Sequence, residues 1–588
     1  MTGKGLSRDV PPFARRFLDA PERVTAIGGG SPGGKARGLL LIRDLLAERF
    51  PAGAFPEFHV DVPTLTVIQT DLFDRFMAHN ELWPFAQSDA DDTRIALAFQ
   101  AAALPPELVG DLRALVEQVR SPLAVRSSSL LEDAREHPFA GVYATKMIPN
   151  NEPDADSRFR RLTEAIKLVY ASTFFAAARR YRDAAGCGPA DEKMAVVIQE
   201  IVGRRHGPRF YPDVSGVARS YSFYPSGAAR PENGFVSLAL GLGKTIVDGG
   251  VVWSYSPAYP HATPPFASPR DLLEQTQHAF WAVSMGGTPR YDPVAETEYL
   301  VQSDLAVSEA DGTLRYTASS YDPGSDRLHV GLRGSGPRAL TFARLLVLEA
   351  LPLNCLIREL LSVSEAALGA PVEIEFALTL AGDEEPPGRL GFLQVRPMGI
   401  SSRPVTIAPG ELDDPRRLVA TNAAMGDGVD GGIADVVFVR PDVFEAGRTR
   451  AIAADIADLN RQLLAERRPY LLIGFGRWGS SDPWLGIPVD WSSIAGARAI
   501  VETSIAGMTV EPSQGSHFFH NLSSFGVTYF TVRPGIDPPI DWAWLAAQPI
   551  AGETRFAQHV RLAAPLLVKV DGRSGRGLIL RPAAEGTS

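Results

Sequence analysis

Residues 122–148 read PLAVRSSSLLEDAREHPFAGVYATKMI and form the most informative segment in the first half of the chain. A short β-branched run ends in Arg126 and three serines at 127–129, and a turn of small residues at Gly141 follows. Guanidinium and hydroxyl groups clustered at a strand end are typical of phosphate binding. The alternative is a serine-rich turn that caps the next helix, which needs only one serine. We expect a strand that leads into a phosphate site.

A glycine-rich loop precedes this segment. Residues 27–38 read IGGGSPGGKARG and lead into LLLIRDLLAERF, whose leucines at 39, 40, 45 and 46 keep helical spacing. A helix N-terminus presents unpaired N–H groups with a partial positive charge, and glycines let phosphate oxygens approach the backbone closely. The spacing fits neither the P-loop pattern nor a strand-GxGxxG-helix unit. We expect an anion-binding loop at a helix N-terminus.

Lysine is scarce in this chain. Lysine and arginine together number 58, and only seven of these residues are lysines, yet Lys35 and Lys244 both lie in glycine-rich loops. The ammonium group is a compact point charge that enters a narrow anion site, which a planar guanidinium does not. The alternative, chance placement in an arginine-rich composition, has more weight for Lys244 than for Lys35.

Helices and strands are mixed along the chain. Helical periodicity at about 157–183 is followed by MAVVIQEIV at 194–202, an alternating strand GVARSYSFYP, and GFVSLALGLGKTIVDGG, a strand that enters a glycine-rich turn. The fold class is therefore α/β or α+β. Further on, ALGAPVEIEFALTL and RLGFLQVRPM are expected to form two strands joined by a polar turn.

Alternation along these two strands places Glu373 and Glu375 on one face of the first, and Gln394 and Arg396 on one face of the second. A carboxylate, an amide oxygen and a guanidinium on facing strands are suited to a divalent cation and a polyphosphate. The alternative is an exposed polar face of an antiparallel sheet.

Composition limits the class of protein. A chain of 588 residues suggests about three to five folding units. It is 45% hydrophobic and 21% charged, and no stretch approaches the roughly 18 apolar residues of a membrane span. A net charge of −10 offers no footprint for nucleic acid or anionic lipid. We expect a cytoplasmic protein that works on small molecules, with Cys187 and Cys355 as buried free thiols.

Five motifs carry a resemblance to a known family. GGKARGLLLIRDLL, LAVRSSSLLEDAREHPFAGVYAT, AVVIQEIV, SLALGLGKTIVDGG, and VEIEFAL followed by LGFLQVRPM resemble, in this order, the ATP-binding domain of the phosphoenolpyruvate synthase and pyruvate phosphate dikinase family. The resemblance covers about residues 25–400. It implies an ATP-grasp fold in which two α+β lobes, residues 20–200 and 201–404, close on the nucleotide.

The resemblance also implies which residues contact the phosphates of ATP. Lys35 of GGK and Arg126 of VRSS would bind them, and Gly141 would lie in the glycine loop over them. Arg396 would steady the transferring phosphate. Lys244 would lie beside the nucleotide, but the family usually has glutamate at this position, so the charge is reversed here.

For the rest of the nucleotide, the resemblance implies that Gln199 and Ile201 border adenine, where backbone groups make much of the recognition. Glu375 and Gln394 correspond to ligands of Mg²⁺. Phosphoryl transfer relies on positioned cations and a metal that neutralises charge, which agrees with these residue types. The expected cofactors are ATP and Mg²⁺.

Residues 405–588 follow a polar, proline-containing linker and are expected to form a smaller mixed α/β domain. They are too few for the barrel of about 250 residues that binds pyruvate in the dikinases. His517 in QGSHFFHN loosely resembles the phosphohistidine context of the family, and His520 is a second candidate. An imidazole is nucleophilic near pH 7. A structural histidine or a metal-binding pair are the alternatives.

The segment GFGRWGSSDPWLG at 474–486 has two equally weighted interpretations, an anion pocket or a loop pinned to the core by tryptophan.

The leading hypothesis is an ATP- and Mg²⁺-dependent phosphotransferase of the dikinase type, with His517 as phosphate relay. The acceptor would be a small molecule, pyruvate or another, or a separate protein. A regulatory protein that binds ATP without transfer is the first alternative, for which Lys244 is the main evidence. An ATP-grasp ligase is the second, although RSS and LQVRP fit that group poorly.

Overall fold

The computed structural model describes most of the chain. The residues it describes are 10–15, 23–51, 53–129, 142–185, 188, 192–222, 229–248, 250–262, 268–274, 276–287, 289–292, 294–381, 387–398, 405–426, 428–466, 468–480, 484, 486–489, 493–504, 527–572 and 574–582.

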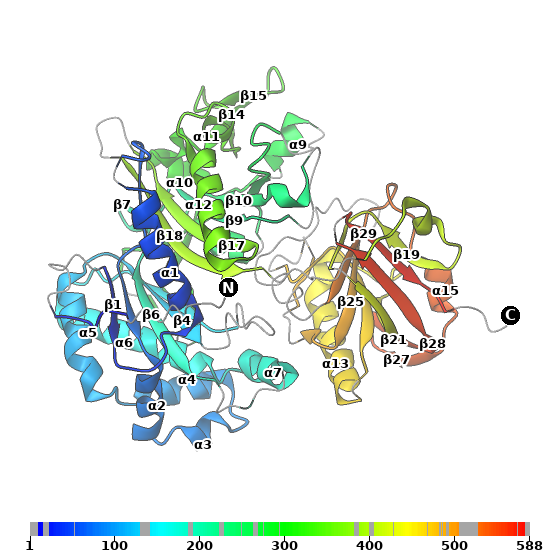
Figure 1. The fold of residues 1–588 in the computed structure, drawn as a ribbon, viewed down its shortest axis with the longest axis horizontal. Coiled ribbons are helices and arrows are strands. Elements are labelled where there is room, and N and C mark those ends of the chain that lie inside the picture. The colour runs from blue at the N-terminus through cyan, green and yellow to red at the C-terminus, as the bar shows by residue number, and fades with distance from the viewer. Residues whose placement is uncertain are drawn as a thin grey trace.

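The first sheet has five strands in the order β1-β3-β6-β4-β5, and only the β1–β3 pair is parallel. Its strands are β1 (Val24–Ile27), β3 (Leu65–Ile68), β6 (Met194–Glu200), β4 (Leu123–Ser129) and β5 (Thr145–Ile148). Helices gather around this sheet in the lower left of Figure 1. They are α2 (Thr70–His79), α3 (Trp83–Ala86), α4 (Asp92–Ala101), α5 (Pro106–Gln118), α6 (Ala155–Ser172) and α7 (Ala176–Ala185).

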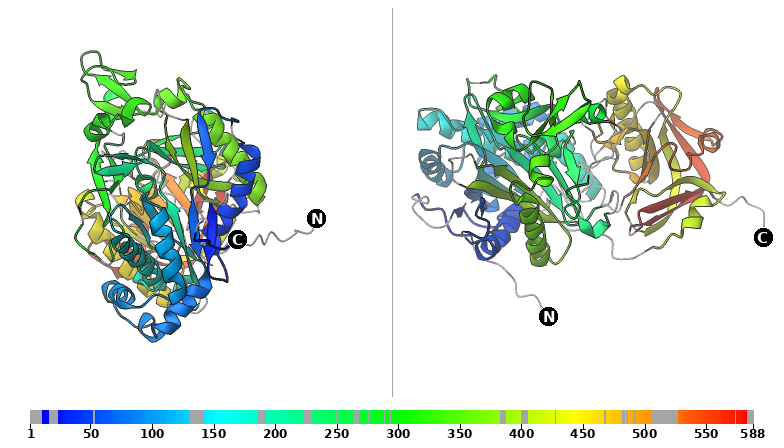
Figure 2. Two further views of the ribbon diagram at one scale, coloured as in Figure 1. Left: turned by 90° about the vertical axis from the view of Figure 1, so that its left-hand side faces the viewer. Right: turned by 90° about the horizontal axis from the view of Figure 1, so that it is seen from above.

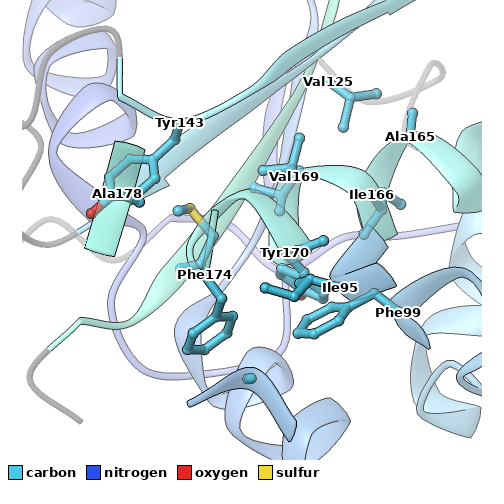
Figure 3. Packing of buried hydrophobic residues seen from close by; sticks show 14 of the residues in the cluster. Ile95, Phe99, Val125, Tyr143, Ala165, Ile166, Val169, Tyr170, Phe174 and Ala178 are labelled. Carbon is cyan, nitrogen blue, oxygen red and sulfur yellow. The ribbon is translucent and has the colours of Figure 1, made fainter. Parts of the chain in front are cut away.

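Alternation along the strands divides the first sheet into two faces. Val125, Val196 and Ile198 belong to the core shared with the helices, where Tyr170 and Phe174 pack near Ile95 and Phe99 (Figure 3). The residues between them in sequence, such as Ala195 and Val197, belong to a second core shared with the next sheet. One face is thus covered by helices, while the other looks toward the second sheet.

The second sheet has six strands in the order β11-β10-β9-β17-β18-β2, and only the β18–β2 pair is parallel. Its strands are β11 (Trp253–Tyr255), β10 (Phe235–Ala239), β9 (Val214–Arg219), β17 (Val372–Thr379), β18 (Gly388–Pro397) and β2 (Phe58–Asp61). The helices α1 (Gly33–Arg49) and α12 (Leu353–Leu368) pack on it. Because α1 also contacts β4, this helix links the two sheets (Figure 1).

Two smaller sheets flank the second sheet. One has the order β13-β12-β8-β7 and the other β15-β14-β16. Their strands are β13 (Leu300–Asp304), β12 (Ala279–Ser284), β8 (Arg209–Tyr211), β7 (Arg204–His206), β15 (Arg327–Val330), β14 (Ala318–Asp322) and β16 (Arg338–Leu340). The short helices among them are α8 (Lys244–Val247), α9 (Pro269–Glu274), α10 (Leu305–Ala310) and α11 (Ala343–Leu346).

The last part of the chain forms a separate large sheet that lies to one side of the others (Figures 1 and 2). Its order is β19-β29-β28-β21-β22-β25-β26-β20, with β27 on β28. The strands are β19 (Arg417–Thr421), β29 (Arg576–Leu580), β28 (Ala557–Asp571), β21 (Gly428–Val439), β22 (Tyr470–Phe475), β25 (Ala497–Thr503), β26 (Thr528–Val532), β20 (Ala424–Met425) and β27 (Ile550–Glu553).

Within this sheet, β21, β22, β25 and β26 are parallel neighbours. Apolar side chains of α13 (Thr449–Ala465) lie in the core on one face, and α15 (Trp542–Ala546) contributes to the core on the other. The hydroxyl of Tyr221 donates to the carbonyl of Gly572 at 3.0 Å and so joins this sheet to the preceding part of the chain.

The mixed α+β class is confirmed, and several boundaries differ from expectation. Residues 58–68 hold two strands in different sheets, since Pro63, which lies between β2 and β3, cannot donate to a ladder. The long helix expected at 157–183 is interrupted between α6 and α7. Cys355 was expected to be buried but is exposed, and Cys187 lies outside the described residues.

In the described part of the chain, no helix is by itself long and apolar enough to cross a membrane. The helices α4 and α5 meet that criterion only as a pair bent by 89°. Their side chains in the core of the first sheet are Ile95, Phe99, Leu108, Leu112, Leu115 and Val116.

Candidate functional site

The glycine-rich loop before α1 forms hydrogen bonds with residues at the start of α2. Gly28, Gly30 and Gly33 have φ angles of 88°, 91° and 76°, which favour glycine. The backbone N–H of Gly29 donates to the Asp71 carboxylate at 2.7 Å, and that of Ser31 to the Thr70 hydroxyl at 2.9 Å. A Cβ on Gly33 would overlap the carbonyl oxygen of Ser128, so glycine lets α1 begin directly against the end of β4.

Lys35, on the first turn of α1, points at the end of β4. Its side chain is buried, and its Nζ donates to the carbonyl and to the hydroxyl of Ser127, each at 3.2 Å. Ser128 Oγ accepts the Ala36 N–H at 3.2 Å and donates to the Pro32 carbonyl at 2.9 Å. Two of the three serines therefore contact the residues that begin the preceding helix α1.

Arg126, on β4 of the first sheet, contacts residues of β17 and β18 in the second sheet. Its Nη2 donates to Gln394 Oε1 at 2.7 Å and to Glu375 Oε2 at 3.0 Å, and its Nη1 donates to the Leu393 carbonyl at 3.2 Å. Glu375 is paired with Gln394 in the register of β17 and β18. The structure thus brings Arg126 on β4 together with Glu375 on β17 and Gln394 on β18, while Lys35 binds Ser127, the residue that follows Arg126 in β4.

A second charged group lies beside this one on the same two strands. Glu373 is paired with Arg396 in register, and Arg396 Nε donates to Glu373 Oε1 at 2.8 Å. From the other side, Arg219 Nε on β9 donates to Glu373 Oε2 at 2.6 Å. All three side chains are buried. The expected shared face of Glu373, Glu375, Gln394 and Arg396 is confirmed, whereas sequence reasoning missed Arg219.

An apolar cluster joins the first sheet to the β12–β8 sheet. Its buried members are Ala124, Ile201, Leu242, Val283 and Met285, and Met147, Phe210, Trp281 and Leu300 pack against them. Gln199 is paired with Ala124 in register, so its side chain is on the same face of the sheet as this cluster. Gln199 is buried, and its Nε2 has no hydrogen-bond acceptor among the described residues. A buried donor without an acceptor is costly unless a ligand satisfies it.

Lys244 opens α8 at the edge of the apolar cluster. Its Nζ pairs with Asp248 at 2.9 Å and lies 6.0 Å from the centre of the Trp281 ring. The aliphatic stem of Lys244 therefore borders the cluster while its charge lies beside a carboxylate. The reversed charge at this position has a local counter-ion.

The charges around Arg126 suit a polyphosphate. Three arginines, Arg126, Arg219 and Arg396, donate to two carboxylates, Glu373 and Glu375. A fourth cation, Lys35, binds Ser127, the residue after Arg126. Among the described residues, no three histidine, cysteine, aspartate or glutamate side chains form a metal-binding group. Glu375 and Gln394 nevertheless offer a carboxylate and an amide oxygen side by side, which are donors that Mg²⁺ accepts.

Several predicted residues lie outside the described part of the chain, namely Gly141, His517 and His520. In the 474–486 segment, Trp478 is fully buried and its indole N–H donates to the Val501 carbonyl at 3.2 Å, which fits a loop pinned by tryptophan. Trp484 is 71% exposed and does not share this role.

Comparison with known proteins agrees with the geometry. Residues 31–411 match the family model described as pyruvate phosphate dikinase, AMP/ATP-binding domain. A phosphoenolpyruvate synthase from Aeropyrum pernix is 26% identical over 243 residues, which cover 37% of this chain and 26% of that protein. The chain therefore matches about a quarter of the length of this relative.

Proposed function

The chain belongs to the pyruvate phosphate dikinase AMP/ATP-binding domain family, and from this premise we propose that it is an ATP- and Mg²⁺-dependent phosphotransferase of the dikinase type. The observation that carries the proposal is the contact of Arg126 with both Glu375 and Gln394, next to the buried Lys35–Ser127 contact. Arg126 comes from the first sheet, whereas Glu375 and Gln394 come from the second. In this proposal the sheets belong to two ATP-grasp lobes that bind the nucleotide between them, about residues 20–200 and 201–404, except that β2 from the first range joins the second sheet.

Each side chain has a distinct part in binding the triphosphate. Lys35 and Arg126 bind phosphate oxygens, and Arg396 holds the transferring group as charge develops on it. Glu375 and Gln394 hold Mg²⁺, which neutralises negative charge on the phosphates when bound. Without the nucleotide, Arg126 occupies both of these oxygen ligands, so binding of ATP requires its guanidinium to move from them to the phosphates.

The adenine base lies against the apolar cluster in this proposal. Gln199 supplies the unsatisfied Nε2 donor for a ring nitrogen, and backbone groups near Ile201 complete the recognition. The Lys244 ammonium lies beside the phosphates and offsets their charge. An apolar site with a few directed polar groups is typical of nucleotide binding.

For the second half of the reaction, we propose His517 as the group that accepts the phosphate and passes it on, with His520 as the second candidate. The nucleophile is the unprotonated nitrogen of the neutral imidazole. It forms an N–P bond while the bridging P–O bond to the rest of the nucleotide breaks, so ADP leaves after attack on the γ phosphorus and AMP after attack on the β phosphorus. The final acceptor is pyruvate, another small molecule or a separate protein. The polar linker near residue 405 separates this part of the chain from the ATP site.

ATP labelled separately at the β and γ positions tests the proposal. The expected result is an acid-labile, base-stable label on the protein that is lost in His517→Ala and kept in a variant of the exposed His261. Transfer of phosphate to an acceptor without a protein-bound label would exclude the phosphohistidine intermediate but would leave the proposed phosphotransferase activity in place. The same experiment separates the alternative of a regulatory ATP-binding protein, favoured by Lys244, which predicts tight binding with neither label nor turnover.

A further inference from the structure

Glu296 is a carboxylate that the proposed mechanism does not use. It lies on the segment between β12 and β13, and its Oε1 accepts the backbone N–H of Thr145 at 3.1 Å. Two residues later, Glu298 forms a buried ion pair with Lys146. Within the part of the chain that the structure describes, Glu296 has no such ion pair. The segment is therefore anchored to β5 by Glu298, and the Glu296 carboxylate keeps acceptor capacity.

The position of Glu296 along the first sheet follows from strand register. Thr145 on β5 is opposite Arg126 on β4, and Met147 is opposite Ala124. Ala124 and Met147 belong to the apolar cluster, whereas Arg126 belongs to the charged group. Glu296 binds the N–H of Thr145, which is opposite Arg126. Its carboxylate therefore lies along the sheet beside the boundary between the apolar cluster at Ala124 and the charged group at Arg126.

Lys244 lies near Glu296. Its Nζ is 6.0 Å from the Trp281 ring in the apolar cluster and pairs with Asp248. Burial raises the pKa of the Glu296 carboxyl, whereas the Thr145 N–H and the charges of Lys244 and Lys146 oppose this shift. Glu296 and Lys244 are therefore electrostatic neighbours.

We propose that Glu296 recognises the sugar of the nucleotide by accepting a hydrogen bond from a ribose hydroxyl. The inference rests on the proposed ATP site. With adenine at the apolar cluster and the phosphates at Lys35 and Arg126, the ribose lies between them, at the level of Thr145. An ionised carboxylate only accepts hydrogen bonds, and the hydroxyls are the only donors on the ribose. The site therefore selects ribonucleotides over deoxynucleotides.

Selection arises from the cost of an unsatisfied group. A deoxyribose leaves the partly buried carboxylate without its donor, and hydrogen bonds to charged groups contribute enough to change affinity by about tenfold to a hundredfold. A phosphate-only ligand gains nothing from Glu296. Glu296 thus acts on the identity of the sugar and not on the triphosphate.

Calorimetric titration of the full chain with ATP, 2′-deoxy-ATP, 3′-deoxy-ATP and inorganic tripolyphosphate, each with Mg²⁺, tests the inference. We expect ATP to bind wild type at least about tenfold more tightly than one of the deoxynucleotides. In Glu296→Ala this ratio falls to near one, and Glu296→Gln, which keeps an acceptor, is intermediate. Glu359→Gln, at an exposed position on α12, serves as the control and affects ATP and the deoxynucleotides equally.

Two outcomes overturn the inference while leaving the ATP site intact: wild type binds all three nucleotides equally, or the preference survives in Glu296→Ala. The first comparison needs no variant, so a folding defect does not obscure it. Failure of both ATP and tripolyphosphate to bind would instead contradict the proposed function, and it would also contradict the inferred recognition of ribose.

Discussion

The guanidinium of Arg126 donates a hydrogen bond to the amide oxygen of Gln394 at 2.7 Å, across 268 positions in the sequence. The same Nη2 donates to Glu375 at 3.0 Å, so one cation binds both oxygen ligands proposed for Mg²⁺. In the proposed function, arginine and a metal ion compete for these atoms, and the phosphates of the nucleotide provide an alternative partner for the guanidinium.

Replacement of Arg126 by methionine tests this competition. We expect ATP affinity to fall about tenfold to a hundredfold, because a charged hydrogen bond to phosphate is lost. Binding of Mn²⁺ without nucleotide should instead become tighter, because Glu375 and Gln394 are released. Calorimetry with ATP and electron paramagnetic resonance of free Mn²⁺ measure the two effects. Arg389→Met, which removes an arginine bound to Asp61 in the second sheet, should change neither. Weaker Mn²⁺ binding in Arg126→Met would contradict the competition.

Lys35 provides a test of the lysine geometry. Its buried ammonium is placed against Ser127, where a wider planar guanidinium has little space. We expect Lys35→Met to weaken binding of ATP and of tripolyphosphate by at least about tenfold, and Lys35→Arg to give little rescue. Lys569→Met, on the C-terminal sheet, is the charge-matched control. Full activity of Lys35→Arg would show that charge alone is sufficient.

Local patterns predicted much of the site. Alternation on the strands that became β17 and β18 correctly placed Glu375 with Gln394, because a period of two fixes the face of every side chain. The glycine loop and the start of α1 were also predicted, because the positions with positive φ are glycines.

What the sequence did not show is pairing between distant segments. Arg219 on β9 binds Glu373 on β17, which is 154 residues later in the sequence. No local pattern shows that these two strands are neighbours. The serines at 127–129 were interpreted from composition alone. The hydrogen bonds of Ser127 and Ser128 to α1 join segments 92 residues apart, which the sequence does not show. Glu296 lacked any motif and was found only from its bond to β5.

The buried Arg219–Glu373–Arg396 group leads to a stability prediction. Glu373→Gln leaves two buried guanidinium groups without their carboxylate, and breaking such a group costs about 3–5 kcal/mol. Thermal unfolding without ligand should show a lower Tm, and Glu359→Gln, at an exposed position on α12, should not. An unchanged Tm for Glu373→Gln would mean that solvent or Glu375 neutralises the arginines.

Gly474 and Trp478 provide a test in the C-terminal sheet. A Cβ on Gly474 would overlap the buried indole ring, so glycine at the end of β22 makes room for it. We expect Gly474→Ala to destabilise this sheet by about 1–3 kcal/mol and to shift tryptophan fluorescence. Gly431→Ala on β21, where a Cβ meets nothing within 4 Å, is the control. Equal stability of the two variants would contradict the close packing.

Asp435, buried at the parallel pair β21–β22, leads to a prediction about pH. Burial alone would raise its pKa, but hydrogen bonds from Arg468, Arg561 and His559 outweigh burial and hold the pKa of Asp435 below its ordinary 3.8. A carboxyl whose pKa is depressed by folding stabilises the protein above its unfolded pKa, and this contribution is lost as pH falls through the folded pKa.

The Asp435→Asn variant measures this contribution. We expect it to be less stable than wild type by about 3 kcal/mol at pH 7, because the charged partners of Asp435 are left unpaired. The difference should be constant down to about pH 4 and shrink below it, as wild type becomes protonated at this site. Denaturant unfolding followed across this range tests the prediction, with the exposed Asp458→Asn as control. A difference that stays constant below pH 3 would exclude Asp435 as the titrating group, since its carboxylate would then contribute nothing through charge.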